Sequence, residues 1–293
     1  FAVRNGKRCH LKKVVKPSAR KQVVSQLKTK FKASLISCCH VMRISRSVYY
    51  YQSTKDDTAL INELRRLAKK LPNRGFDTYY NRLRNEGFKC SRSRLLRVYR
   101  EMGLVKRPKK RKKLPDAERK PLYIAQKPNE IWSMDFMSYS LTDKRALRVL
   151  NIIDDYNREC LVSHGSVSYP STRVIDRLEE LKSEKGLPKY IRTDNGPEFR
   201  SSEYLSWCKK HDVSPVYSSP GKPMENGYIE GFNRTFREDV LDANYFSDTG
   251  QFNLVAELWM DDYNQSHPHK SLGYQSPKEY LKQNQKQEFS NLA

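Results

Sequence analysis

The sequence predicts two kinds of fold in one chain: all-α units up to Pro121, and an α/β domain with a mixed five-stranded sheet and flanking helices after it. Two observations predict this division. Up to Pro121, apolar residues recur at the three- and four-residue spacing of helices, whereas beyond it short apolar runs alternate with helical segments. The charge changes at the same point: residues 1–121 hold 35 basic and 8 acidic side chains, and residues 122–293 hold 21 basic and 25 acidic ones. The net charge of +23 therefore comes from a polycationic first part, which is typical of binding to a polyanion.

The composition excludes several classes of protein. No run approaches the ~20 apolar residues of a membrane helix, and the first residues do not resemble a secretory signal. The six cysteines are scattered and none forms a CxxC pair, so we interpret them as reduced thiols rather than zinc ligands. The first residue is Phe1 rather than Met, so we expect a fragment or a part of a longer fused product.

Residues 1–54 are predicted to form a basic helical region. The first 32 residues are rich in Lys and Arg with a weak apolar stripe, and no fold can be assigned to them. Two short helices are predicted between residues 33 and 51, where Ser45 is a suitable N-cap for the second and Arg46 lies on its first turn. This pattern is typical of a helix-turn-helix, whose second helix enters the DNA major groove; an ordinary helical hairpin is the alternative.

Residues 55–104 are predicted to form a second helical, DNA-binding region. Leucines at positions 60, 64, 67 and 71 mark the buried face of one helix, and a further helix is capped by Ser91 and ended by Gly103. The exposed face of that last helix carries four arginines, for which we predict contact with nucleic acid rather than a merely solvated face. These are Arg92, Arg94, Arg97 and Arg100.

Residues 105–125 are predicted to be a basic linker. Seven of the eight residues from 106 to 113 are Lys or Arg, and with prolines and no apolar period the segment cannot build a core. We expect Lys109, Lys110 and Arg111 to lie along a DNA backbone, since each neutralised phosphate adds to affinity at low salt. A flexible spacer without DNA contacts is the alternative.

Residues 126–285 are predicted to form the α/β domain with a C-terminal extension. The expected strands are 131–141, 145–153, 160–162, 190–193 and 213–217, and the expected helices lie at 174–181, 201–211 and about 224–241. The first three strands are joined by short connections and should pair antiparallel. This order of elements specifies a mixed sheet with helices packed against it.

Three carboxylates occur where this fold can bring them together. Asp135 lies in the first strand, Asp194 ends the fourth, and Glu230 lies on the helix after the fifth. If the first and fourth strands are neighbours, the two aspartates meet at one end of the sheet. Clustered carboxylates repel unless cations neutralise them, and oxygen ligands suit Mg²⁺ or Mn²⁺. Two such ions ~3.5–4 Å apart can activate an attacking oxygen and stabilise a leaving one at a phosphodiester.

The helix that carries Glu230 has a polar stripe. Asn226, Glu230, Asn233 and Arg237 recur at the spacing of one helix face. We predict that Asn226, Asn233 and Arg237 contact DNA or support the metal ligands. A solvated face is the alternative, and Arg237 could instead form an ordinary surface ion pair.

At these residues the sequence resembles a known family. The segments 132–136 (WSMDF), 192–199 (RTDNGPEF) and 226–233 (NGYIEGFN) resemble the DDE catalytic core shared by retroviral integrases and bacterial insertion-sequence transposases. The 35 residues between Asp194 and Glu230 and the basic residue Arg237 also match that core. The segment 263–280 and the helical region before Pro121 are similar to the insertion-sequence-three family, so the resemblance covers residues 11 to 280.

The resemblance implies a ribonuclease-H-like core and a second-frame transposase that cleaves and transfers DNA strands at the ends of an insertion sequence. It implies Asp135, Asp194 and Glu230 as catalytic metal ligands, double-stranded DNA at element ends and target as partner, and a homo-oligomer on DNA. An upstream first-frame protein, or a fusion with it, is a further expected partner, and the expected location is the bacterial cytoplasm, at the nucleoid. Two alternatives are a non-catalytic, sequence-specific DNA-binding regulator and a ribonuclease-H-like nuclease that does not join strands.

Overall fold

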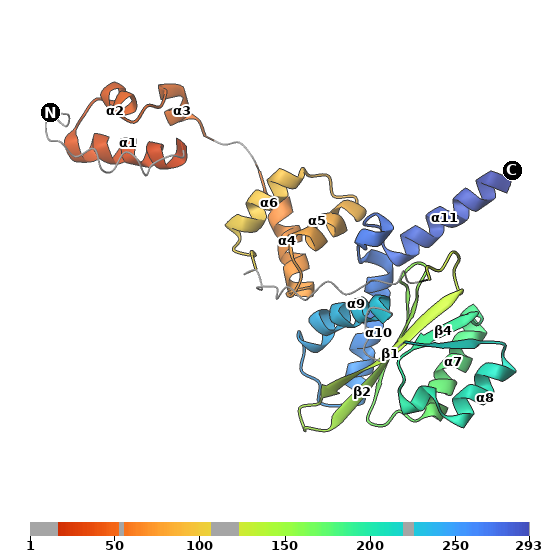
Figure 1. The fold of residues 1–293 in the computed structure, drawn as a ribbon. Coiled ribbons are helices and arrows are strands. Elements are labelled where there is room, and N and C mark those ends of the chain that lie inside the picture. The colour runs from red at the N-terminus through yellow and green to blue at the C-terminus, as the bar shows by residue number, and fades with distance from the viewer. Residues whose placement is uncertain (1–16, 53–55, 107–122, 219–225, 293) are drawn as a thin grey trace. The chain divides into compact units, whose positions relative to one another are not determined.

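The computed structural model describes residues 17–52, 56–106, 123–218 and 226–292, with side chains up to residue 285 (Figure 1). These residues form two compact units, Phe1–Asp57 and Thr58–Ala293. None of the helices in the described ranges is long and apolar enough to cross a membrane.

The first unit is a small helical one. It contains α1 (Pro17–Phe31), α2 (Leu35–Val41) and α3 (Arg46–Tyr50). Its core is formed by Val24, Cys38, Cys39 and Met42. The hydroxyl oxygen of Ser45 accepts a hydrogen bond from the Val48 N–H, which confirms the predicted N-cap.

No fold could be assigned to residues 1–32 from the sequence, yet α1 forms within them. Its apolar stripe is narrow, and Val24 is the one buried residue on this helix. The helix is stabilised by packing against α2. The helix-turn-helix interpretation of α2 and α3 stays a prediction.

The second unit begins with three more helices, α4 (Thr58–Lys70), α5 (Phe76–Asn85) and α6 (Arg92–Glu101). The four leucines expected to share a buried face do so, together with Leu95, Val98 and Tyr99 of α6. Ser91 caps α6 by accepting from the Arg94 N–H, and Gly103 ends it in the left-handed region at φ +71°.

The sheet contains β1 (Ile131–Ser140), β2 (Ala146–Asp154), β3 (Cys160–Ser166), β4 (Tyr190–Thr193) and β5 (Ser214–Tyr217). Their order is β3-β2-β1-β4-β5. The first three strands pair antiparallel, whereas β4 runs parallel to β1 and to β5. The predicted mixed five-stranded sheet is therefore confirmed.

Helices cover both faces of the sheet (Figure 1). α7 (Ser171–Lys185) and α8 (Ser202–Lys210) pack with Trp132, Ile152 and Ile191 on one face. On the other, α9 (Gly227–Phe236) and α10 (Thr249–Ser266) pack with Val149 and Ile153. Short 3₁₀ turns η2 (Pro197–Phe199) and η5 (Lys270–Leu272) and the helix α11 (Pro277–Leu292) complete the described part.

The expected long helix from about residue 224 to 241 differs at its C-terminal end, and its first residues lie outside the described part. The α-helix ends at Phe236, where it widens into a π-helical turn, η4 (Arg237–Leu241). Such turns need tertiary support. Here Asp239 is buried and accepts hydrogen bonds from Arg74 and Trp259.

The helices α4–α6 pack onto the α/β domain within the second unit. The Arg74 guanidinium, at the α4–α5 turn, bonds both carboxylate oxygens of Asp239 at 2.7 and 3.0 Å and the Thr235 carbonyl at 2.9 Å. Arg82 of α5 is only 1% exposed and pairs with Asp262 of α10. These contacts join the two parts through buried ion pairs that sequence patterns do not reveal.

Two asparagines of α10 cover the free edge of β3. The Asn264 amide accepts from the Cys160 N–H and donates to the Cys160 carbonyl, both at 2.8 Å. The Asn253 amide likewise accepts from the Gly165 N–H at 2.7 Å and donates to the Gly165 carbonyl at 3.1 Å. Each side chain thus replaces the backbone of a missing neighbouring strand.

Candidate active site

The strand register places the two aspartates side by side. Ser133 of β1 pairs with Arg192 of β4 in the parallel ladder. Asp135, in the middle of β1, and Asp194, directly after β4, each lie two residues further along and on the same face, because side chains alternate along a strand. Glu230 lies on the first turn of α9, which packs on this face against β1. The predicted meeting of the three segments is what the fold produces.

The charges of the three carboxylates act on one another. Asp135 is partly buried, and its pKa is raised to about 7 by burial first and then by the negative charges of Asp194 and Glu230, against a lowering hydrogen bond from Asn233. Asp194 and Glu230 are exposed. Across the described ranges no three His, Cys, Asp or Glu side chains lie close enough together to hold a metal ion as they stand. The charges of Asp194 and Glu230 therefore raise the pKa of Asp135, although the three carboxylates do not yet form a metal site.

A buried chain of polar side chains holds Asp135. Asn233 donates to Asp135 Oδ2 at 2.7 Å and accepts from the Asn151 amide at 2.7 Å. The Ser163 hydroxyl donates in turn to Asn151 Oδ1 at 2.8 Å. The register sets Asp135 opposite Asn151 and Asn151 opposite Ser163, so the chain crosses three strands in one row. Asp135 is thereby fixed in orientation by groups that solvent does not reach.

Sequence reasoning missed Asn151 and Ser163. The available signal was a single amide in the otherwise apolar run of β2, since buried polar side chains are normally hydrogen-bonded. For Asn233 two roles were open, DNA contact or support of the metal ligands. Its side chain is 9% exposed and is hydrogen-bonded at both ends, so it supports Asp135, whereas its contact with DNA stays a prediction.

We expect Asn151→Leu to lower catalysis about tenfold and to cost ~1–3 kcal/mol of stability, because it leaves the buried Asn233 carbonyl without a donor. Steady-state rates and urea unfolding measure the two effects. Ser163→Ala is the matched control, since it removes only the far end of the chain and should change the rate much less. Equal rates for Asn151→Leu and the unmodified protein would show that Asp135 needs no such support.

The loop after Asp194 is tied down on both sides. Asp194 Oδ1 accepts from the Gly196 N–H at 3.0 Å, and the Asn195 amide donates to the Ser218 carbonyl at 2.8 Å. Glu198 pairs with Arg148 of β2, whose guanidinium lies 4.2 Å from the centre of the Phe136 ring. These contacts anchor the turn after Asp194 to β2 and to Ser218, the residue that follows β5.

The other predicted site residues are placed as follows. Asn226 is buried at the start of α9, whereas Arg237 is exposed on η4. The four arginines of α6 are all exposed, but Arg92 pairs with Asp77 and Arg97 pairs with Glu101. Arg46 is exposed on the first turn of α3. Lys109, Lys110 and Arg111 lie outside the described residues, so DNA contact by any of these side chains stays a prediction.

The raised pKa of Asp135 predicts an unusual pH dependence of stability without metal. A carboxyl whose pKa is about 7 in the folded state and ~3.9 unfolded stabilises the fold at low pH, and this contribution is lost as the pH rises from 4 through 7. In EDTA, Asp135→Asn should therefore raise the melting temperature at pH 8, by ~2–4 °C for each kcal/mol recovered, and have little effect at pH 4.

The matched control is Asp143→Asn in the β1–β2 turn. Asp143 is exposed, and hydrogen bonds from the Arg145 backbone and side chain lower its pKa, so its neutralisation should not stabilise the protein at pH 8. A melting temperature of Asp135→Asn below that of the unmodified protein at pH 8 would contradict the assigned electrostatics.

Comparison with known proteins identifies families and relatives that agree with this fold. The integrase core domain family matches residues 125–223, and a second integrase core domain family matches residues 211–277. The 31.7 kDa protein of insertion element IS407 from Burkholderia multivorans is 32% identical over 88% of this chain and 94% of its own length. The 39.2 kDa protein of insertion element IS476 from Xanthomonas euvesicatoria is 30% identical over 95% and 81%.

The transposase InsD of insertion element IS2 from Escherichia coli is 27% identical over 78% of this chain and 80% of its own length. The matched families span the whole sheet and the helix of Glu230, and the insertion-element proteins extend the similarity into the helices before it. The chain therefore belongs to the insertion-sequence-three type of DDE transposases, the insertion-element proteins whose catalytic part is an integrase core domain.

Proposed function

We propose that Asp135, Asp194 and Glu230 are the catalytic residues of this transposase and hold two divalent cations, Mg²⁺ or Mn²⁺. The observation that carries the proposal is that Asp135 and Asp194 lie side by side on one face of the neighbouring parallel strands β1 and β4, close enough to Glu230 for its charge to raise the pKa of Asp135. An all-oxygen set of ligands with exposed members suits these hard cations.

The side chains of this chain have distinct tasks in the proposed reaction. Asp135 must give up its proton before it can act as a ligand, and Asn233 favours the charged form by donating to Oδ2. The short turn after Asp194 and the first turn of α9 hold the other two carboxylates toward solvent, where a DNA strand can approach. When bound, the cations supply activation of the attacking oxygen and stabilisation of the leaving one.

In the proposed reaction, cleavage at an element end leaves a 3′-hydroxyl that attacks a second phosphodiester, so one bond is exchanged for another. The reaction needs DNA held on both sides of the site. The proposed DNA contacts are Arg46, the α6 arginines, the basic linker and Arg237. Because contacts to phosphates make DNA affinity depend on salt, they can be tested by measuring that affinity at several salt concentrations. Assembly as a homo-oligomer on DNA and cooperation with an upstream first-frame protein belong to the same proposal.

The test is to incubate purified protein and Mg²⁺ with DNA that carries candidate element ends, with and without an upstream partner, and to analyse the products for joined strands. Joined strands support the proposal. Hydrolysed but unjoined strands would indicate the nuclease alternative. A deletion of residues 122–293 that leaves the biological function intact would indicate a DNA-binding regulator instead.

A further inference from the structure

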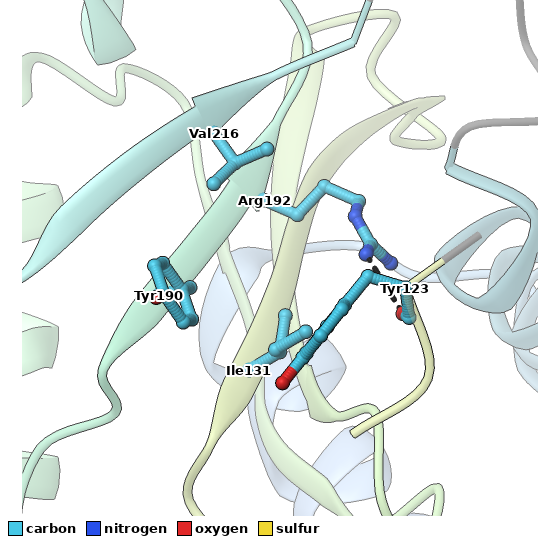
Figure 2. Close-up of a pocket in the computed structure, with 5 residues that line it drawn as sticks. All are labelled: Tyr123, Ile131, Tyr190, Arg192 and Val216. Carbon is cyan, nitrogen blue, oxygen red and sulfur yellow. Dashed lines mark hydrogen bonds between the residues drawn. The ribbon is translucent and has the colours of Figure 1, made fainter.

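A small pocket lies beside the candidate active site. Its volume is about 190 Å³, and its walls come from β1, β4, β5 and the segment before β1 (Figure 2). The described residues that line it are Tyr123, Ile131, Tyr190, Arg192 and Val216. No role in the proposed chemistry has been assigned to any of them.

The pocket and the two aspartates lie in line on the same face of β1 and β4. Ile131 pairs with Tyr190 in the parallel ladder, and each precedes its aspartate by four residues. An even number of residues keeps side chains on one face, and four residues span ~13 Å at ~3.3 Å per residue. A strand of DNA leaving the site could cover this distance in about four nucleotides at ~3.4 Å each.

Arg192 makes one wall of the pocket rigid. Its Nη1 donates to Asp155 at 2.6 Å, and its Nη2 donates to the Tyr123 carbonyl at 3.3 Å. The Arg192 and Asp155 side chains are 7% and 0% exposed, so the guanidinium is held by a buried ion pair. Figure 2 shows this guanidinium reaching the backbone of Tyr123. A fixed planar guanidinium offers a stacking face and directed N–H donors.

Two tyrosine rings supply flat apolar walls. The rings of Tyr123 and Tyr190 have centres 6.5 Å apart and meet at 67°. Tyr123 is 58% exposed, and its ring is oriented by a hydrogen bond from its hydroxyl to Glu130 at 2.9 Å. Drug-sized ligands need pockets of ~300–1,000 Å³, so this one suits a smaller, flat group.

The surroundings of the pocket favour an anionic ligand. Lys189 is exposed, with its ammonium 5.2 Å from the centre of the Tyr190 ring, and Lys127 is exposed close to Glu130. The nearby acids Asp155 and Glu130 are each engaged, by Arg192 and by Tyr123. Aromatic walls next to cations are how proteins bind single-stranded nucleic acid, with bases on the rings and phosphates on the cations.

We propose that this pocket binds one unpaired base of the DNA strand that passes through the active site. The inference rests on the proposed function, because it specifies the substrate as DNA that is locally single-stranded about four nucleotides from the reacting phosphate. Stacking of the base on Tyr123 and Tyr190 is the main contact, and Arg192 contacts its edge.

The experiment measures binding of two DNA probes by fluorescence anisotropy in EDTA, which prevents cleavage. One is a blunt duplex, and the other is the same duplex with a four-nucleotide overhang, prepared with either polarity. We expect the overhang to bind about tenfold more tightly, within the ~5- to 100-fold that stacking of one base supplies. Tyr123→Ala should abolish this preference without changing the Kd for the blunt duplex, since it keeps the backbone carbonyl that Arg192 uses.

Three controls make the result specific. Tyr123→Phe keeps the ring and should keep the preference, and Tyr190→Ala should reduce it like Tyr123→Ala. Tyr245→Ala, at a tyrosine that is 87% exposed elsewhere on the domain, should have no effect. Thermal melting confirms that each variant is folded.

The other possible outcomes contradict either the base pocket or the proposed function. A wild-type protein that binds both probes equally overturns the base pocket but leaves the proposed function. Failure to bind either probe contradicts the proposed function itself. If Tyr123→Ala changes the oligomeric state in gel filtration and leaves the overhang preference intact, the pocket accommodates a second copy of the chain, and the proposal is wrong.

Discussion

Glu230→Gln should reduce strand cleavage and strand transfer by at least ~10³-fold while DNA binding persists. The amide keeps the size of the side chain but loses the negative charge that a cation requires. Glu230 is exposed on the first turn of α9, and the helix packs through Ile229, Phe232 and Phe236, so its fold should be unaffected. Product gels and anisotropy with blunt DNA measure the two quantities.

The matched control for this variant is Glu257→Gln on α10, where an exposed glutamate lies outside the candidate site. It should retain full activity. A second readout is independent of turnover: because the charge of Glu230 raises the pKa of Asp135, Glu230→Gln should lower that pKa below about 7 in metal-free protein. Undiminished strand transfer by Glu230→Gln would refute the assignment of the catalytic residues.

Asp262→Ala should destabilise the second unit by ~3–5 kcal/mol, because it leaves the buried charge of Arg82 without its partner. Lys70 also loses a 2.6 Å bond to Asp262. The pKa of Asp262 reflects this environment: burial opposes ionisation, but Arg82 and Lys70 outweigh it and lower the pKa. A lowered pKa means that the stabilisation is present above pH ~4 and is lost as the pH falls below it.

Urea unfolding at pH 7 and again at low pH measures this effect. Asp261→Ala is the matched control, since the adjacent aspartate is exposed and its loss should stay within ~0.5 kcal/mol. Replacing both partners, as Arg82→Met with Asp262→Leu, should recover much of the loss because no unpaired charge remains. If Asp262→Ala unfolds like the control, the packing of α4–α6 on the core depends on other contacts.

Local patterns were sufficient to predict the strands and the antiparallel pairing of the first three, because apolar runs and short connections restrict how a sheet can be built. The meeting of Asp135 with Asp194 followed only if the first and fourth strands are neighbours, which the structure shows. Local patterns also placed Asn233 on the same side of α9 as Glu230. They could not show that Asn233 turns inward to Asp135, since that depends on Asn151 lying opposite Asp135 in the register.

Contacts between segments that are far apart in the sequence could not be predicted for a similar reason. Arg74 and Asp239 are 165 residues apart in the sequence, and neither stands in a motif, so their buried pair could not be anticipated. Arg82 sits in a basic half where a surface position is the ordinary expectation, yet it is almost fully enclosed. The helices before the linker were predicted as a separate DNA-binding region, and only the structure shows that they also support the helix of Glu230.

The amides of Asn253 and Asn264 have a consequence for how copies of this protein can associate. They occupy the outward hydrogen-bonding groups of β3 at Cys160 and Gly165. At the opposite edge, the N–H groups of Ser214 in β5 and of Ser218 after it donate inward, to the carbonyls of Lys189 and Thr193, so the alternate residue Pro215 faces outward and has no N–H to offer. Both edges of the sheet are therefore poor templates for pairing with another strand. This protects copies at high local concentration from fibrous aggregation. It leaves helix faces and DNA as the surfaces on which an ordered complex can be built.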